Sequence, residues 1–231
     1  MTYEFLVLSL LFLVPGAVFA LLRPDLRGLM GRMALASMPF AVTERLFVPA
    51  YWKPRFLFGL GDLLGFGLED VIFVAGLGAY ACATYPVVCD RRVVPVAAVP
   101  VRPWARGAAM IGAAIAAAVL LIALGVPVLY ATVVAMALGT AAMLVTRRDL
   151  IVPGLAGALL GALVYLALCL VFARLIPGVF ERTWRPSILL PGRLLGVPLD
   201  ELLYGLGAGL SGTVFPAWAW GLRFAPGRPA S

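Results

Sequence analysis

Two pairs of adjacent acidic residues are the positions in this sequence most capable of chemistry. Glu69 and Asp70 form one pair, and Asp200 and Glu201 form the other. Both pairs lie in apolar sequence, where a carboxylate is costly unless it faces a partner or the interior of a helix bundle. Burial and the neighbouring charge are expected to keep one carboxyl of each pair protonated. Each pair could therefore donate a proton to a non-polar substrate.

The same pairs also fit a structural role at the start of helices. Acidic residues in a first helical turn complement the helix dipole, and Pro198 suits the first position of a helix. The two interpretations are compatible, and the sequence leaves both open. Glu44 is a candidate third carboxyl of the site; its alternative interpretation is an interfacial pair with Arg45, which would contribute little energy.

The absence of His restricts the chemistry that the chain can perform. The sequence has no His and three Cys, none of them in a CxxC spacing. A zinc or haem site with His ligands is therefore excluded, as is a Ser-His or Cys-His catalytic unit. Acid–base chemistry would come from carboxylates, Tyr, Arg or water. We predict no metal and no cofactor.

The acidic pairs belong to an internal repeat. Trp52-Lys53-Pro54 precedes the first pair, and Trp184-Arg185-Pro186 precedes the second. A Gly-x-Gly follows each pair, beginning at Gly76 and at Gly207. This shared order predicts two related halves. An even number of helices between the copies would make the repeat parallel, with its axis near the membrane normal.

Aromatic residues of the repeat are candidates for binding the substrate. Trp52 and Trp184 could offer their faces to a cation near the carboxylates. Phe73 and Tyr204 occupy matching positions after the two acidic pairs. We predict that these four side chains line the substrate site. The other Trp residues are expected in the aromatic belt at the membrane surface.

Composition assigns these residues to a membrane protein. The chain of 231 residues is 63% hydrophobic and 13% charged, with a mean hydropathy of +1.05. A soluble domain is about 45–50% apolar and about 25% charged. We therefore predict an all-α integral membrane fold of about seven transmembrane helices with a parallel internal pseudo-repeat. The expected spans are roughly 4–22, 29–48, 64–88, 107–124, 126–145, 150–175 and 194–222.

The spans suggest a division of the chain into four parts. These are a first repeat at 1–90, a connector at 91–125, a second repeat at 126–222 and a disordered tail at 223–231. The net charge of +7 comes from Arg residues that lie mainly between apolar runs. Their distribution favours an outside N-terminus and an inside C-terminus, and we expect the chain in a bacterial inner membrane. Nucleic acid is not expected as a partner.

The tandem pattern resembles a known family. A Trp followed by G-x-P-L-E-E-x-L-F on three-helix units is similar to the lycopene cyclase domain of membrane carotenoid cyclases. The second copy, Gly196–Tyr204, is the closer match, and Thr43–Trp52 resembles a bacterial branch that carries this domain. The resemblance covers nearly the whole chain. The first copy departs from the pattern, because Gly67 replaces the Pro and Asp70 replaces the second Glu.

The resemblance implies an acid-catalysed isomerisation. An acid protonates the end double bond of linear lycopene, the resulting carbocation closes a ring, and loss of a proton completes the reaction. On this reading Glu69 or Glu201 is the proton donor. Asp70 and Asp200 tune the donor, and Glu44 assists. The expected partner is a lipid-soluble isoprenoid or carotenoid in the membrane.

A non-enzymatic protein is the alternative that the sequence leaves open. A lipid-binding or transport-related module would keep the fold without ring closure. A wet, charged path from Glu44 to Arg45 would favour transport. A dry, elongated apolar tunnel that ends at the carboxylates would favour an isoprenoid.

Overall fold

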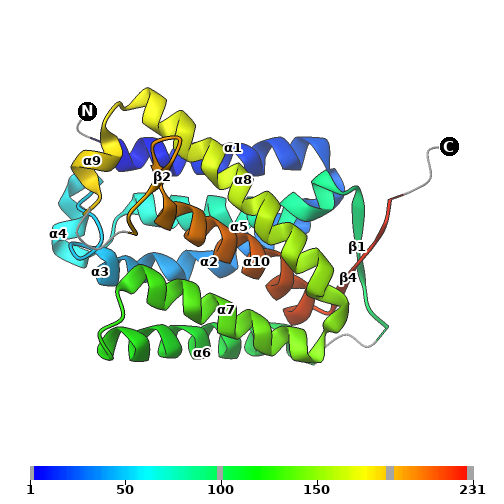
Figure 1. The fold of residues 1–231 in the computed structure, drawn as a ribbon. Coiled ribbons are helices and arrows are strands. Elements are labelled where there is room, and N and C mark those ends of the chain that lie inside the picture. The colour runs from blue at the N-terminus through cyan, green and yellow to red at the C-terminus, as the bar shows by residue number, and fades with distance from the viewer. Residues whose placement is uncertain (1–2, 98–100, 186–189, 228–231) are drawn as a thin grey trace.

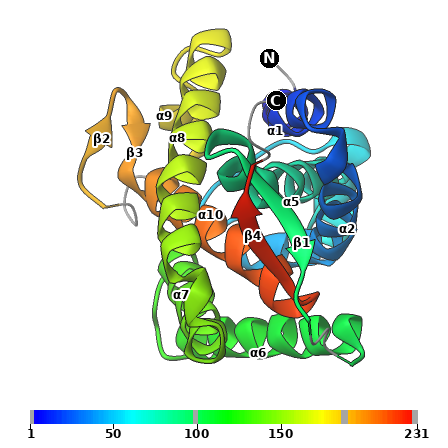
Figure 2. The same ribbon diagram turned by 90° about the vertical axis from the view of Figure 1, so that its right-hand side faces the viewer.

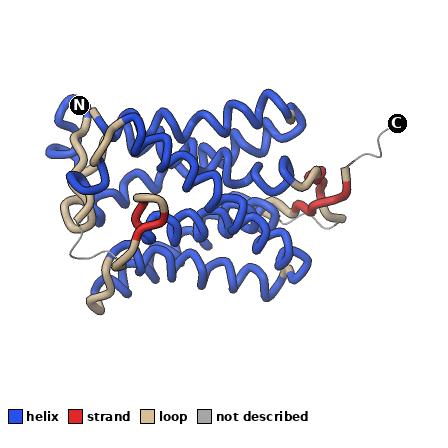
Figure 3. Tube along the Cα trace, turned by 45° about the horizontal axis from the view of Figure 1, so that its top comes forward, coloured by secondary structure: helices blue, strands red, loops and turns tan. Residues whose placement is uncertain are grey.

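The protein is a bundle of long helices with one short strand pair at one end and another at its side (Figures 1 and 3). The computed structural model describes residues 3–97, 101–185 and 190–227. The α-helices are α1 Glu4–Leu22, α2 Arg27–Ser37, α3 Glu44–Phe47, α4 Leu60–Leu64, α5 Leu68–Val88, α6 Pro103–Ala123, α7 Val128–Thr146, α8 Ile151–Leu175, α9 Val179–Thr183 and α10 Leu199–Ala219. Short 3₁₀ helices are η1 Pro24–Leu26, η2 Met38–Thr43, η3 Leu57–Gly59 and η4 Arg148–Leu150. The prediction of a helical fold is confirmed.

Five helical segments within the described residues are long and apolar enough to cross a membrane. They are Glu4–Leu22, Leu68–Val88, Pro103–Ala123, Val128–Thr146 and Arg148–Leu175. Each has 19 to 28 residues, and about 20 apolar residues suffice to span the hydrocarbon core. These five segments support the assignment of the chain to a membrane.

The segment expected as a second span, 29–48, is broken. Helix α2 ends at Ser37, and the chain continues as η2 and then as the four-residue α3. Pro39 lies at the start of η2. A proline lacks an N–H and disfavours a helical conformation in the residue before it, so it interrupts the α-helix here.

Helices α5 and α10 form the centre of the bundle. Helix α5 packs against α1 and α2, and α10 packs against α8, α7 and α5. Helices α8 and α10 approach each other closely where Gly161 lies against the backbone of Gly209. Small residues permit this distance, as in other helix pairs of membrane proteins. Helix α10 carries Asp200 and Glu201 and lies outside the five apolar segments.

Two strands join the ends of the central helices. Strand β1, Arg91–Pro95, pairs antiparallel with β4, Leu222–Pro226, with Val93 opposite Phe224 (Figure 2). This pairing corrects the expectation that the chain is disordered from Arg223, because the backbone of 223–226 is held by β1. Residues 228–231 of the expected tail lie outside the described residues. A second short pair is β2 Arg193–Leu194 with β3 Val197–Pro198.

A second antiparallel joint lies at the opposite end of the bundle. Trp52 forms an isolated bridge with Trp184. The Lys53 N–H donates to the carbonyl of Thr183 at 2.9 Å, and the Arg185 N–H donates to the carbonyl of Tyr51 at 3.0 Å. The N-terminal and C-terminal parts of the chain are therefore joined by backbone hydrogen bonds at both ends of the central helices.

An arginine fixes the far end of each central helix. Arg23 follows α1, binds Asp25 and donates to the carbonyl of Pro86 in α5 at 3.1 Å. Arg147 follows α7, binds Asp149 and donates to the carbonyl of Ala217 in α10 at 3.3 Å. Each guanidinium also donates to a residue that opens a strand, Arg91 of β1 or Leu222 of β4. The ion pair lowers the pKa of the Asp25 carboxyl, chiefly through the hydrogen bond from Arg23.

Candidate functional site

The two acidic pairs occupy the same positions in the first turns of α5 and α10. Glu69 and Asp200 are the second residues of their helices, and Asp70 and Glu201 are the third. All four are buried. Because successive residues on a helix point in directions about 100° apart, the two members of each pair have different surroundings.

The second-position carboxylates face the segments that precede their helices, and Asp200 also binds α7. Glu69 accepts a hydrogen bond from the Leu57 N–H at 2.6 Å. Asp200 accepts one from the Leu190 N–H at 3.0 Å and another from the Tyr130 hydroxyl at 2.6 Å. Neither carboxylate lines the large cavity inside the bundle. In this geometry both carboxylates hold the chain that leads into their helices.

The third-position carboxylates face an elongated cavity of about 250 Å³. Asp70, Glu201 and Glu44 all line it. The rest of its wall is mainly apolar and comes from α1, α2, η2, α3, α5, α6, α7, α8 and α10. Along α10 the lining runs from Glu201 to Phe215, which is about 21 Å at about 1.5 Å per helical residue. The carboxyls therefore lie together toward one end of a long apolar space.

Glu201 is the most heavily hydrogen-bonded of these carboxylates. Glu201 as a residue is only 5% exposed. The Tyr51 hydroxyl and the Trp184 indole N–H both donate to Oε1 at 2.7 Å, and the Tyr165 hydroxyl donates to Oε2 at 2.7 Å. Burial raises the pKa of the Tyr51 phenol, and the adjacent Glu201 raises it further. Tyr51 therefore keeps its proton and acts as a donor.

Within the described residues, Asp70 and Glu44 each have one hydrogen-bond donor. The Gly67 N–H donates to Asp70 Oδ2 at 2.6 Å and closes a capping arrangement at the start of α5. The Trp52 indole N–H donates to Glu44 Oε1. A single hydrogen bond leaves further acceptor capacity on each carboxyl. Both groups thus remain available to the contents of the cavity.

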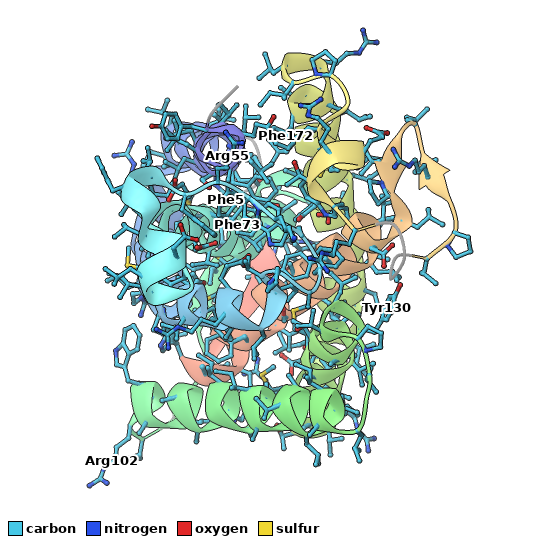
Figure 4. All side chains as sticks on the ribbon, turned by 90° about the vertical axis from the view of Figure 1, so that its left-hand side faces the viewer. Phe5, Arg55, Phe73, Arg102, Tyr130 and Phe172 are labelled. Carbon is cyan, nitrogen blue, oxygen red and sulfur yellow. The ribbon has the colours of Figure 1, made fainter. Side chains whose placement is uncertain are left out.

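The four predicted aromatic residues also line the cavity. Trp52, Trp184, Phe73 and Tyr204 are all part of its wall. The two indole rings lie 5.0 Å apart at 45°, beside the backbone bridge that joins them. Figure 4 shows Phe5 and Phe73 inside the bundle, seen from the end where α5 and α10 begin; their ring centroids are 6.2 Å apart. The structure therefore brings these aromatic faces and three of the five predicted carboxyls into one space.

Two tyrosines of the site were not predicted from the sequence. Tyr51 precedes Trp52, so its place in the repeat is a signal that could have identified it. Tyr165 lies in the middle of the apolar α8 and carries no such signal. Among the residues that the structure describes, no group of three or more His, Cys, Asp or Glu side chains could hold a metal ion.

Comparison with known proteins agrees with the resemblance in the second half of the chain. Residues 127–219 match the family model for lycopene cyclase. The matched segment contains α7, α8, α9 and α10, and therefore both Asp200 and Glu201. No curated protein and no solved structure matches the chain.

Proposed function

We propose that this chain, whose residues 127–219 match the lycopene cyclase family, is a membrane carotenoid cyclase. It would close a ring at the end of a linear isoprenoid without net oxidation or reduction. The observation that carries the proposal is the buried Glu201, held by three donors at the wall of a long apolar cavity that Asp70 and Glu44 also line.

The shape and lining of the cavity fit an isoprenoid better than an ion. A transported ion would need a polar path from Glu44 toward Arg45. Arg45 is instead exposed, donates to the carbonyl of Leu64 and is not part of the cavity wall. A linear hydrocarbon gains free energy from apolar burial along the whole cavity. Its end would lie among the carboxyls.

The reaction requires only the addition of one proton to the substrate and the loss of another from the ring. Asp70 or Glu44, in its protonated form, gives a proton to one carbon of the terminal double bond. The π electrons of a second double bond then attack the cationic carbon and form the ring C–C bond. The cation that results on the ring loses a proton to a carboxylate, and those C–H electrons become the ring double bond. Product and substrate have the same formula, so no oxidant or reductant takes part.

Glu201 is suited to act as the negative partner of the carbocation and as the final base. Three hydrogen-bond donors favour the ionised form of a carboxyl. A preorganised negative charge in a water-poor cavity stabilises developing positive charge strongly. The faces of Trp52 and Trp184 add cation–π attraction on the same side, and Phe73 and Tyr204 complete the aromatic wall.

The paired geometry of the two halves supports a parallel internal repeat. We infer that residues 1–90 and 126–222 are the two copies, that α6 belongs to the connector, and that the break after α2 interrupts the second of seven membrane segments. Trp52 pairs with Trp184 at corresponding places within the copies. Val93 pairs with Phe224 at corresponding places directly after them. A two-fold relation requires such self-matching at its axis. The Arg-rich loops favour an outside N-terminus and an inside C-terminus in a bacterial inner membrane.

Expression in cells that accumulate lycopene tests this function. We expect chromatography of the extracted pigments to reveal monocyclic or bicyclic carotenes with the wild-type chain. Unchanged lycopene, with the protein verified in the membrane fraction, would contradict the proposal and favour a non-enzymatic lipid-binding role.

A further inference from the structure

The bundle has two corresponding seams between its halves, and one of them is closed. Helix α1 of the first half packs against α8 of the second. The Phe12 ring meets the Tyr165 ring edge-on with centroids 5.0 Å apart. At the end of the same seam, Arg182 binds Glu4 at 2.9 Å. Aromatic packing and an ion pair thus seal the contact between α1 and α8.

The other seam, between α7 and the broken segment η2–α3, is hollow. A small cavity of about 60 Å³ lies there, next to the main cavity. The two cavities share six lining residues, which are Phe40, Thr43, Ala114, Thr132, Ala135 and Met136. The small cavity also reaches Leu46, which is 38% exposed. A continuous row of lining residues therefore leads from the protein surface to the main cavity.

The opening follows from local sequence. On the closed side α8 is one unbroken helix of 25 residues. On the open side Pro39 breaks the helix after α2, and the side chains facing the seam from α6 and α7 include the small Ala114, Thr132 and Ala135. Helix α6 lies along α7 at the edge of the bundle (Figure 1) and is the least buried of the five apolar helices. It forms the outer wall of the seam.

We propose that the linear isoprenoid enters sideways from the bilayer through this seam, between η2–α3 and the α6–α7 hairpin. The inference rests on the proposed function, because it assigns an occupant to the same cavity. A hydrocarbon dissolved among lipid tails reaches the seam without crossing water, since α6 and α7 are both apolar enough to face lipid. Its leading end then passes Ala114 and Thr132 toward Asp70 and Glu201.

Photolabelling tests the route independently of catalysis. The purified full chain is placed in phosphatidylcholine vesicles that contain a fatty acid with a diazirine near its chain end. Leu77 and Ala81 of α5 line the main cavity and are 8% and 2% exposed, so lipid outside the bundle cannot reach them. We expect light to label the α5 peptide that contains these residues in the wild-type protein.

Ala114→Trp is the variant that blocks the seam, and Ala113→Trp is its matched control. Ala113 is the exposed neighbour of Ala114 and lines neither cavity. We expect Ala114→Trp to lower the α5 label about tenfold and Ala113→Trp to leave it unchanged. A tenfold change corresponds to about 1.4 kcal/mol in the free energy of access to the cavity. Thr132→Phe narrows the same seam from α7 and serves if Ala114→Trp does not fold.

The outcomes separate the route from the reaction. Equal α5 labelling in the blocked and control variants, or no α5 label in the wild type, would overturn the lateral entrance. Turnover of lycopene is measured on the same samples. Seam-dependent labelling without ring formation would keep the entrance and reject the cyclase, whereas ring formation with seam-independent labelling would keep the cyclase and reject the entrance.

Discussion

The starts of α5 and α10 carry the same kind of acidic pair, but they differ in how the cavity-facing carboxyl is held. Glu201 accepts hydrogen bonds from three side chains on three separate segments. Asp70, its counterpart, accepts one from the Gly67 backbone. Two halves of similar sequence thus produce one site with unequal carboxyls, one held by three side-chain donors and the other by a single backbone N–H.

The carboxyls that face away from the cavity, Asp200 and Glu69, also differ in how completely they are hydrogen-bonded. Both oxygens of Asp200 are hydrogen-bonded, one to Tyr130 and one to the Leu190 N–H. Glu69 Oε2 is buried and has no hydrogen-bond partner within the described part of the chain. Tyr130 lies as many residues before Arg147 as Leu6 lies before Arg23. Leu6 therefore takes the place of Tyr130 in the first half. The second half is the more completely satisfied one, and it is also the half that matches the cyclase family.

The largest effect is expected from Glu201→Gln. The variant keeps the size of the side chain but removes the negative charge and the final base. General acid–base groups contribute about 10²–10⁴ in rate, so we expect ring formation in membranes to fall by that factor. Glu69→Gln is the matched control, since Glu69 lies off the cavity. Equal losses in the two variants, at equal protein levels, would remove the distinction between the two positions.

The proton donors should show smaller individual effects. Asp70→Asn leaves Glu44, and Glu44→Gln leaves Asp70, so each can partly replace the other. We expect each single change to slow ring formation by roughly tenfold to a hundredfold, within the range of general-acid catalysis. The double variant should lose more than either single one. Full activity in the double variant would exclude both groups as donors.

The tyrosines around Glu201 are expected to matter through that carboxylate. A hydrogen bond to a charged group is worth about 1.5–3 kcal/mol, so Tyr51→Phe or Tyr165→Phe should each reduce the rate about tenfold or more. Neither should have a further effect when Glu201 is already Gln. Tyr130→Phe is the control, because Tyr130 binds Asp200 outside the cavity. Losses that simply add to Glu201→Gln would indicate a role in folding instead.

The smallest effect concerns Arg23, which follows α1 and holds the far end of α5. Arg23 lowers the pKa of the Asp25 carboxyl. The pair therefore adds stability above the unfolded-state pKa of about 3.9, and this contribution is lost as the pH falls through the lowered folded value. Since Asp25 is half exposed, we expect less than about 1 kcal/mol. Thermal unfolding in detergent at pH 6 and near pH 3 measures it, and Asp25→Asn should remove the pH dependence of this pair.

Several features could be predicted from the sequence because they depend on local pattern. Apolar runs identified the helices, and the repeated Trp and acidic residues identified side chains that meet at one end of the bundle. The different roles within each acidic pair could not be read, because they depend on which face of α5 and α10 meets the cavity. Tyr165 was missed because a tyrosine in an apolar helix has no distinctive spacing.

The strands β1 and β4 and the break after α2 were also missed. Residues 91–95 and 222–226 are short segments whose pairing depends on bringing together parts of the chain far apart in sequence. The segment 29–48 is apolar enough to suggest one helix, and its hydrophobicity masks the effect of Pro39. That break distinguishes the open seam, between α7 and η2–α3, from the closed seam between α1 and α8.

Solvent isotope incorporation tests the central claim most directly. Membranes containing the wild-type chain are incubated with lycopene in D₂O, and the carotenes are analysed by mass spectrometry. We expect cyclic products that carry one solvent-derived deuterium per ring, and at least about a hundredfold less of them from membranes with Glu201→Gln. Cyclic products without deuterium, or deuterated rings formed equally by the Glu201→Gln variant, would contradict the claim.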